Sequence, residues 1–211
     1  MEHLPIEITN NVKNYIIFKP KNKNELQKAV DLWCSNKNKA LNYYGHISLW
    51  NTSLITDMSN LFKDKEFDDN INDWDVSNVI NMEFMFKGVV FMPYFDTNYI
   101  HQKLNKWDVS SVTNMSGMFS EAKLFNQNLD SWNVSSVINM TFMFEGAESF
   151  NQPLNSWNVS SVIDMNAMFR RTSSFNQPLN SWDVSSVTNM FWLFDRAYLF
   201  NKKNASWYEF D

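Results

Sequence analysis

The sequence predicts an α/β repeat solenoid of the leucine-rich-repeat type, with one short parallel strand and one short helix in each 25-residue repeat, and a helical cap at the N-terminal end. Two observations lead to this fold class. Tryptophans recur every 25 residues late in the chain, at Trp107, Trp132, Trp157, Trp182 and Trp207. The residues around them recur as well, as FNQPLNSWNVSSVIDMNAMF from Phe150 and FNQPLNSWDVSSVTNMFWLF from Phe175.

The chain divides into two parts. Residues 1–42 form an N-terminal segment and helical cap, and residues 43–211 form the repeat region. About six complete copies are followed by a truncated one, and an insertion near residues 88–100 lengthens the second copy. The copies begin at Tyr43, Phe67, Ile100, Phe125, Phe150 and Phe175, and the truncated copy at Phe200. We call the complete copies repeats 1 to 6. One copy is too small to bury its own apolar face, so the copies are expected to stack.

The cap is predicted from the segment 21–42. Leu26, Ala29, Val30 and Trp33 recur at the i, i+3, i+4, i+7 spacing of an amphipathic helix, which we expect to cover repeat 1. Cys34 lies beside this apolar face, where a small buried hydrophobe is favoured over a reactive thiol.

The strand of each repeat is predicted from the pattern Leu-x-x-Trp-x-Val, as in Leu154 to Val159, because residues two apart share one face of an extended segment. The helix is predicted from the apolar residues that follow, which in repeat 5 are Val162, Met165, Met168 and Phe169. Ser160 is a candidate N-cap of this helix. We interpret the methionine and aromatic stripe as core.

Asparagine also recurs at a fixed turn position in the repeats. Asn151 and its counterparts turn the chain towards the next strand. Because an asparagine side chain can bond neighbouring backbone, stacked copies are able to form a ladder.

Candidate partner-binding residues are those that differ between repeats. Ten positions after the tryptophan stand Phe84, Phe142 and Trp192, which project outward if the segment is α-helical and are partly buried if it is short or 3₁₀. The insertion adds Phe91, Tyr94 and Phe95, either as a contact loop or as a cover for a neighbouring groove. The end near Trp207 is an open sheet edge or a docking surface unless the chain covers it locally, and we favour the locally covered edge.

Composition argues against several classes of function. The net charge is −5 and basic residues form no stripe, so nucleic-acid binding is disfavoured. No apolar run is long enough to span a membrane. The N-terminus does not read as a signal peptide, so host cytoplasm or virion is expected rather than secretion.

No enzyme signature, cofactor site or metal site is recognised either. The three histidines lack metal-ligand spacing, and the phosphate-binding and hydrolase motifs do not occur. The acidic run 68–75 lacks the central glycine and the final glutamate of a calcium loop. We therefore expect no enzyme.

The motif W-D-V-S-S-V-T-N-M-x-x-M-F followed by F-N-Q-x-L, in six copies from Trp50 to Phe194, resembles the BspA-like leucine-rich-repeat surface proteins, also described as a mycoplasma lipoprotein-associated repeat of unknown function. The segment from Glu25 to Trp33 is similar to one that precedes such repeats in members from algae and large DNA viruses of protists. The resemblance implies a leucine-rich-repeat-like solenoid and, in bacterial members, surface adhesion. The chain departs from those members in lacking an export signal and a lipobox cysteine, which favours a viral or protist origin.

A weaker resemblance concerns residues 4–16, where L-P-x-E-I is similar to the start of an F-box. The expected function is therefore a non-enzymatic protein–protein interaction scaffold. The alternatives are a structural or surface/adhesion component that associates with itself through its C-terminal end, and an F-box-like adaptor in ubiquitin ligation.

Overall fold

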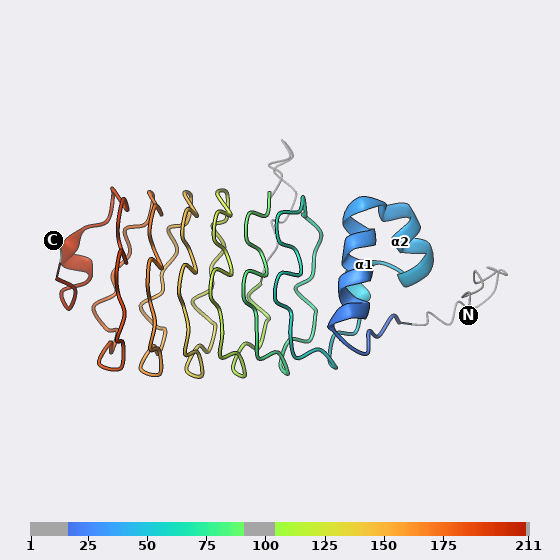
Figure 1. Ribbon diagram of the computed structural model, residues 1–211, viewed down its shortest axis with the longest axis horizontal. Helices are drawn as coiled ribbons and strands as arrows, with labels where there is room; N and C mark the ends of the chain where they lie inside the picture. The colour runs from blue at the N-terminus through green and yellow to red at the C-terminus, as the bar shows by residue number, and fades with distance from the viewer. Residues whose placement is uncertain (1–16, 91–103, 210–211) are drawn as a thin grey trace.

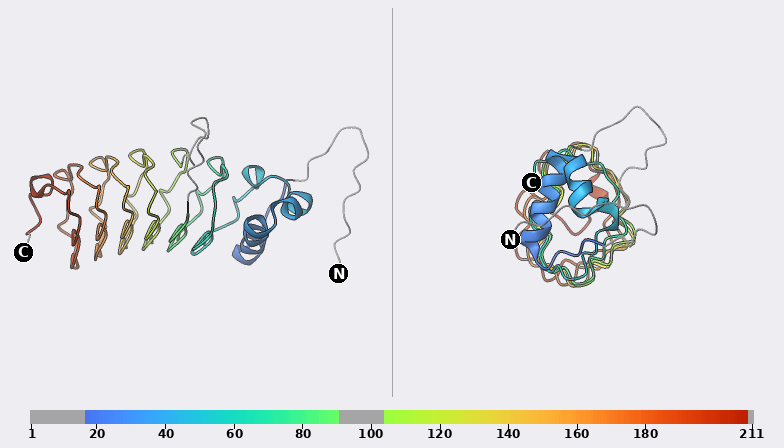
Figure 2. Two further views of the ribbon diagram at one scale, coloured as in Figure 1. Left: turned by 90° about the horizontal axis from the view of Figure 1, so that it is seen from above. Right: turned by 90° about the vertical axis from the view of Figure 1, so that its right-hand side faces the viewer.

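The computed structural model describes residues 17–90 and 104–209. Its repeats lie side by side in one row along the long axis of the molecule, with the two α-helices at one end and the C-terminus at the other (Figures 1 and 2). The elements are the α-helices α1 (Lys23–Ser35) and α2 (Lys37–Tyr44) and the 3₁₀ helices η1 (Ile47–Leu49) and η2 (Lys202–Asn204).

The amphipathic helix expected between residues 21 and 42 is formed by α1, and α2 follows after a break. Helix α1 begins after Asn22, whose side chain accepts from the backbone amide of Glu25, as an N-cap does. Asn36 ends α1 and caps α2 in the same way through the amide of Lys39. The four apolar residues that predicted the helix, Leu26, Ala29, Val30 and Trp33, are all buried.

Parallel pairing between repeats was predicted in the wrong place. The described residues contain isolated parallel bridges rather than strands, and most of these bridges lie seven positions after each tryptophan, at Asp57, Asn81, Asn114, Asn139, Asp164 and Asn189. The Leu-x-x-Trp segment makes a turn instead, because the amide of Trp157 donates to the carbonyl of Leu154 at 3.1 Å. A closed turn at that point is incompatible with an extended strand.

The helix predicted in each repeat is also wrong, since the described repeats contain chained turns in that segment. The amide of Met168 closes a three-residue turn on Met165 at 3.2 Å, whereas the amide of Ala167 donates to Phe191 of the next repeat at 2.8 Å. Every second amide thus leaves its own repeat and cannot make the i→i−4 bond of an α-helix. Ser160 is accordingly no N-cap; its amide donates to the side chain of Asn158 at 3.2 Å.

The apolar stripe forms a continuous core, as predicted. Val162, Met165, Met168 and Phe169 are each 0% exposed. Phenylalanines of successive repeats stack with ring centroids 5.4 to 5.7 Å apart, in the column Phe62, Phe86, Phe119, Phe144, Phe169 and Phe194. In repeats 2 to 6, the indole of the repeat tryptophan donates to a carbonyl of the preceding repeat, for example Trp157 to Leu129 at 3.0 Å. The tryptophan is therefore both apolar filling and a polar link between repeats.

The asparagine ladder is confirmed. The amide of Asn151 donates to the side chain of Asn126 at 3.0 Å, and Asn176 and Asn201 continue the series at 2.9 and 2.8 Å. One residue type at one turn position thus holds repeats 4 to 6 and the truncated copy in register.

Candidate interaction surface

The column that contains Phe84, Phe142 and Trp192 has a left-handed backbone. Its six members, Asn60, Phe84, Gly117, Phe142, Ala167 and Trp192, have φ between 51° and 61°. The prediction that the side chains point outward assumed an α-helix, which this conformation excludes. Phe84 and Phe142 are half-buried, and Trp192 is 61% exposed.

Small residues alternate with aromatic ones in this column, and the alternation has a steric reason. The ring of Phe84 lies over Gly117, where an added Cβ would come within 2.0 Å of the ring. Cationic groups lie over the aromatic rings: Lys87 Nζ is 5.0 Å from the ring of Phe84, and the guanidinium carbon of Arg170 is 5.5 Å from the ring of Trp192. Phe84 is therefore held in place within the row.

A second left-handed column runs four positions later and carries charge, in Asp64, Gly88, Glu121, Gly146, Arg171 and Arg196. Glu121 lies over Gly146, and its carboxylate meets Arg171 at 3.0 Å across two repeats. Arg196 is the last member, and its ion contact is Asp195 at 3.9 Å. Its cationic group is thus weakly engaged at the end of the column.

Repeat 6 carries four exposed large apolar side chains, which we call the terminal cluster: Phe191, Trp192, Tyr198 and Leu199, 75%, 61%, 79% and 65% exposed. The corresponding positions of repeat 5 hold Asn166, Ala167, Ser173 and Ser174. Sequence reasoning found Trp192 and missed the other three, although aligning the repeats column by column shows the change from small or polar to large apolar residues. Large apolar side chains exposed in one repeat are candidates for an interaction site.

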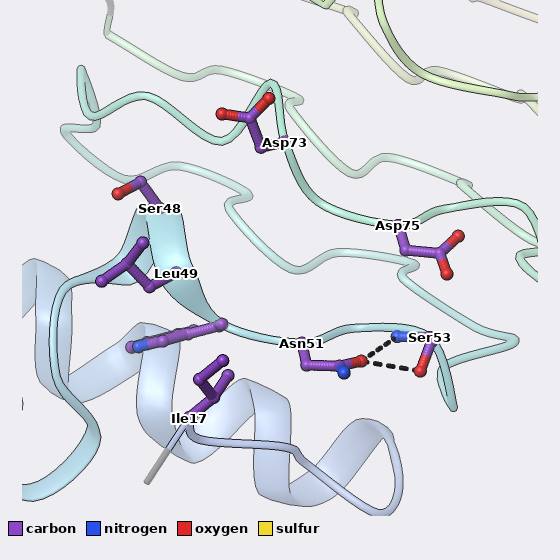
Figure 3. Close-up of a pocket in the computed structure, with 8 residues that line it drawn as sticks. Ile17, Ser48, Leu49, Asn51, Ser53, Asp73 and Asp75 are labelled. Carbon is purple, nitrogen blue, oxygen red and sulfur yellow. Dashed lines mark hydrogen bonds between the residues drawn. The ribbon is translucent and has the colours of Figure 1, made fainter. Parts of the chain in front are cut away.

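A pocket of about 450 Å³ lies at the other end, between the 17–20 segment, η1 and repeat 2 (Figure 3). Ile17, Leu49 and Trp50 form its apolar side, and Asp73 and Asp75 face them. Both carboxylates already have partners, since Asp73 pairs with Lys106 at 2.7 Å and Asp75 accepts from the amide and hydroxyl of Ser77. The pocket therefore offers neither a free carboxylate pair nor a histidine for catalysis.

In the acidic run 68–75 of repeat 2, the carboxylate of Asp69 also has partners. Asp69 accepts from the indole of Trp33 at 2.8 Å and pairs with Lys37 at 2.6 Å. Within the described ranges, no group of three or more histidine, cysteine or acidic side chains is placed to hold a metal ion. The acidic side chain at 69 thus joins the cap to repeat 2.

The single cysteine has a thiol of low reactivity. Burial raises the pKa of the Cys34 thiol to about 11, and the nearby acids Asp31 and Asp69 add to this effect while Lys65 opposes it. A thiol with this pKa is protonated at neutral pH and a poor nucleophile.

Phe91, Tyr94 and Phe95, with the rest of the insertion from residue 91, lie outside the described residues, as does the F-box-like segment 4–16. Among the helices that are described, none combines the length and the apolar character needed to cross a bilayer.

Comparison with protein families identifies one match. The family model described as "Mycoplasma protein of unknown function, DUF285" matches residues 31–92 and 90–207, which together span most of the chain. Neither the comparison with curated proteins nor that with solved structures gave a significant match.

Proposed function

The chain belongs to the DUF285 family of mycoplasma proteins of unknown function, and we propose that it is a non-enzymatic protein–protein interaction scaffold on a leucine-rich-repeat-like solenoid. We further propose that its repeats are related to the BspA-like surface proteins and that the chain comes from a large DNA virus or a protist. The helix Glu25–Trp33 that suggested this origin lies within α1.

The terminal cluster is the observation that carries the interaction function. Its four side chains are 61–79% exposed, so packing within the chain does not account for their size. A large apolar side chain left in water forgoes about 1.5 to 3 kcal/mol of burial free energy, which contact with a partner would recover. The polar and small residues at the same columns of repeat 5 indicate that the stack itself does not require apolar groups there.

The proposal assigns no enzymatic role, and the contacts of the described side chains support this part of it. The carboxylates of the pocket, Asp73 and Asp75, have lysine and serine partners, and Asp69 has an indole partner. The ring nitrogen of His46 is bonded to Ser48, two residues away. These contacts hold turns and the cap, which suits a scaffold.

The test replaces the terminal cluster by the residues of repeat 5, in the variant Phe191→Asn, Trp192→Ala, Tyr198→Ser and Leu199→Ser. Tagged wild type and variant are incubated with lysate, and captured polypeptides are quantified by mass spectrometry. We expect a polypeptide that wild type enriches to be lost with the variant, while the melting temperature changes by no more than about 2 °C.

A matched control carries Ile138→Thr and Ile163→Thr. These isoleucines are 46% and 47% exposed, and threonine stands in the same column at Thr113 and Thr188. The control should capture as wild type does. Equal capture by all three proteins, or no capture by wild type, would reject the proposed function.

A further inference from the structure

A second row of asparagine side chains runs beside the asparagine ladder. It lies two positions before each tryptophan, at Asn155 in repeat 5 and Asn180 in repeat 6. The side-chain oxygen of Asn155 accepts from the backbone amide of Ser181 at 3.2 Å, and that of Asn180 accepts from the amide of Ser206 at 3.0 Å. Each row therefore binds the following repeat through its oxygens, and two rows of amide groups follow the stack.

A proline stands between the two rows in repeats 5 and 6. Pro153 and Asn155 are exposed, whereas Leu154 between them is 0% exposed. Residues two apart lie on one side of an extended segment, so Asn151, Pro153 and Asn155 share the outer side. We call this outer surface of repeats 4 to 6 the amide platform, which consists of Asn126, Asn151, Asn155, Asn176, Pro153 and Pro178.

The polar groups of the platform have fixed orientations. The oxygens of Asn126 and Asn151 accept from backbone amides of the next repeat, so their amide nitrogens point away from it. Gln152 and Gln177 donate through Nε2 to the same two oxygens at 3.0 Å. Within the described chain, the Nδ2 groups of these asparagines have no acceptor and the Oε1 atoms of these glutamines have no donor. Donors and acceptors are thus adjacent and held in place at each repeat.

The platform carries no charge in repeats 5 and 6. The stretches 150–157 and 175–182 contain no charged residue, whereas the equivalent stretch 67–74 of repeat 2 contains three aspartates. None of the large apolar side chains that are exposed in the described chain lies in either of the neutral stretches. The surface thus lacks both the charge that selects an ionic partner and the apolar centre of a protein interface.

A neutral oligosaccharide matches these groups. Each of its hydroxyls both accepts and donates a hydrogen bond, so it suits an amide nitrogen next to a glutamine oxygen. The C–H groups on the faces of a sugar ring suit the proline rings of Pro153 and Pro178. Because the amides are already fixed by the stack, binding costs little side-chain entropy.

We propose that the amide platform binds a neutral linear oligosaccharide that lies along the stack, with successive sugar units on successive repeats. Ladder asparagines donate to hydroxyl oxygens, and the glutamines accept from hydroxyl groups. This binding function is separate from the proposed protein interaction, because the terminal cluster occupies other columns of the repeat. Either function is able to fail while the other holds.

The probes are cellohexaose, xylohexaose, mannohexaose and chitohexaose, which are linear and uncharged. Each is titrated into the full chain, and side-chain amide signals are followed by NMR. With at least one probe, the signals of Asn126, Asn151 and Asn176 should shift, whereas those of Asn133 and Asn158, which lie directly after a tryptophan, should not. No shift with any of the probes, or shifts confined to residues outside the platform, would overturn the proposal.

A blocking variant tests the same site by affinity. Pro153→Lys with Pro178→Lys places long side chains over the platform, and Lys203 shows that this column accepts lysine. Isothermal titration with the hexaose that binds should show at least about tenfold weaker binding.

The matched control is Ser161→Lys with Ser186→Lys, which adds the same charge to the same repeats at exposed positions. Leu54, in the same column, is 52% exposed, so the column accepts a long side chain. The control should bind as wild type does, and the melting temperature of both variants should change by no more than about 2 °C. Equal affinity of the blocking variant and the control would contradict the proposed site.

Chain length tests the orientation along the stack. The disaccharide of the sugar that binds spans fewer repeats, so it should bind at least about tenfold more weakly than the hexaose. Equal affinity of the two would show that the ligand does not follow the stack.

Two further outcomes would also overturn the proposal. If a heparin hexasaccharide shifts the platform signals and the neutral hexaoses do not, the surface selects charge. If no hexaose binds but the blocking variant loses a polypeptide that wild type captures, the platform is a protein contact, and the proposed scaffold function stands without the oligosaccharide.

Discussion

The two ends of the stack are finished in opposite ways. At the N-terminal end, α1 places Leu26, Ala29, Val30 and Trp33 against repeat 1, where all four are buried. Its polar residues complete the contact: Gln27 donates to Leu61, and Lys23 pairs with Asp57 at 3.0 Å. At the C-terminal end, η2 follows repeat 6, and Val184, Val187 and Met190 are only half-buried, although their counterparts in repeat 5 are buried.

A cap on one terminal face of the repeat stack does not require a cap on the other face. The terminal faces of a stacked-repeat protein expose core unless something caps them. The cap at the first end combines apolar packing with side-chain hydrogen bonds to the orphan carbonyl of Leu61. The last repeat instead carries large apolar side chains at its surface, which we propose to contact a partner protein.

Two tryptophans, one at each end, should separate the two roles most clearly. Trp33 is 3% exposed and packs edge-on against Trp50 at 5.9 Å, whereas Trp192 is 61% exposed. Trp33→Ala should cost about 3 to 5 kcal/mol because it opens a cavity beneath the cap. Trp192→Ala should change the free energy of unfolding by less than about 0.5 kcal/mol, since alanine occupies the same column at Ala167.

Thermal unfolding followed by circular dichroism measures both variants. Trp33→Ala is expected to lower the melting temperature by about 10 °C. A comparable fall for Trp192→Ala would mean that the exposed ring is part of the core, and the contrast between the two ends would be lost.

The hydrogen bond from Gln27 to Leu61 gives a smaller effect at the same end. Gln27→Ala leaves the carbonyl of Leu61 without its cap donor and should cost about 1 kcal/mol. Lys28→Ala, at an exposed position of the same helix, is the control and should be close to neutral. Urea titration of the two variants measures the difference, and equal midpoints would show that this carbonyl needs no cap.

The repeat, the core and the asparagine ladder followed from the sequence because they depend on which residues recur. The 25-residue offset of Asn126, Asn151 and Asn176 is a pattern of letters, and so is the apolar stripe. The helix did not follow correctly. Met165 and Met168 are three residues apart. This spacing fits one face of a helix, and it fits equally well a turn in which an amide donates to the carbonyl three residues back.

The sequence contained a signal for the left-handed columns, which the helical periodicity did not reveal. Gly117 and Asn60 share a column with Phe84, and glycine and asparagine are the residues that best tolerate positive φ. The terminal cluster had a weaker signal in the sequence, since only a comparison of repeat 6 with repeat 5 reveals it.

The smallest expected effect is the response of the cap to acid. Partial burial tends to raise the pKa of Asp57, but bonds from the amide of Ser59, from Lys23 and from the hydroxyl of Ser59 outweigh it, so the pKa is lowered overall. A carboxyl with a lowered pKa stabilises the fold above its unfolded pKa of about 3.9, and this stabilisation is lost as the pH falls through the folded value.

Asp57→Asn tests this linkage with little change in shape, because asparagine occupies the same column at Asn81. Asp57 is 41% exposed, so solvent screening limits the expected cost at pH 7 to a few tenths of a kcal/mol, or about 1 °C in melting temperature. The difference from wild type should shrink as the pH falls through the lowered folded pKa of Asp57, because both side chains are neutral once Asp57 is protonated. Melting temperatures measured from pH 7 to pH 3 give this difference directly. A difference that does not shrink as the pH falls would place the effect of Asp57 in packing rather than in charge.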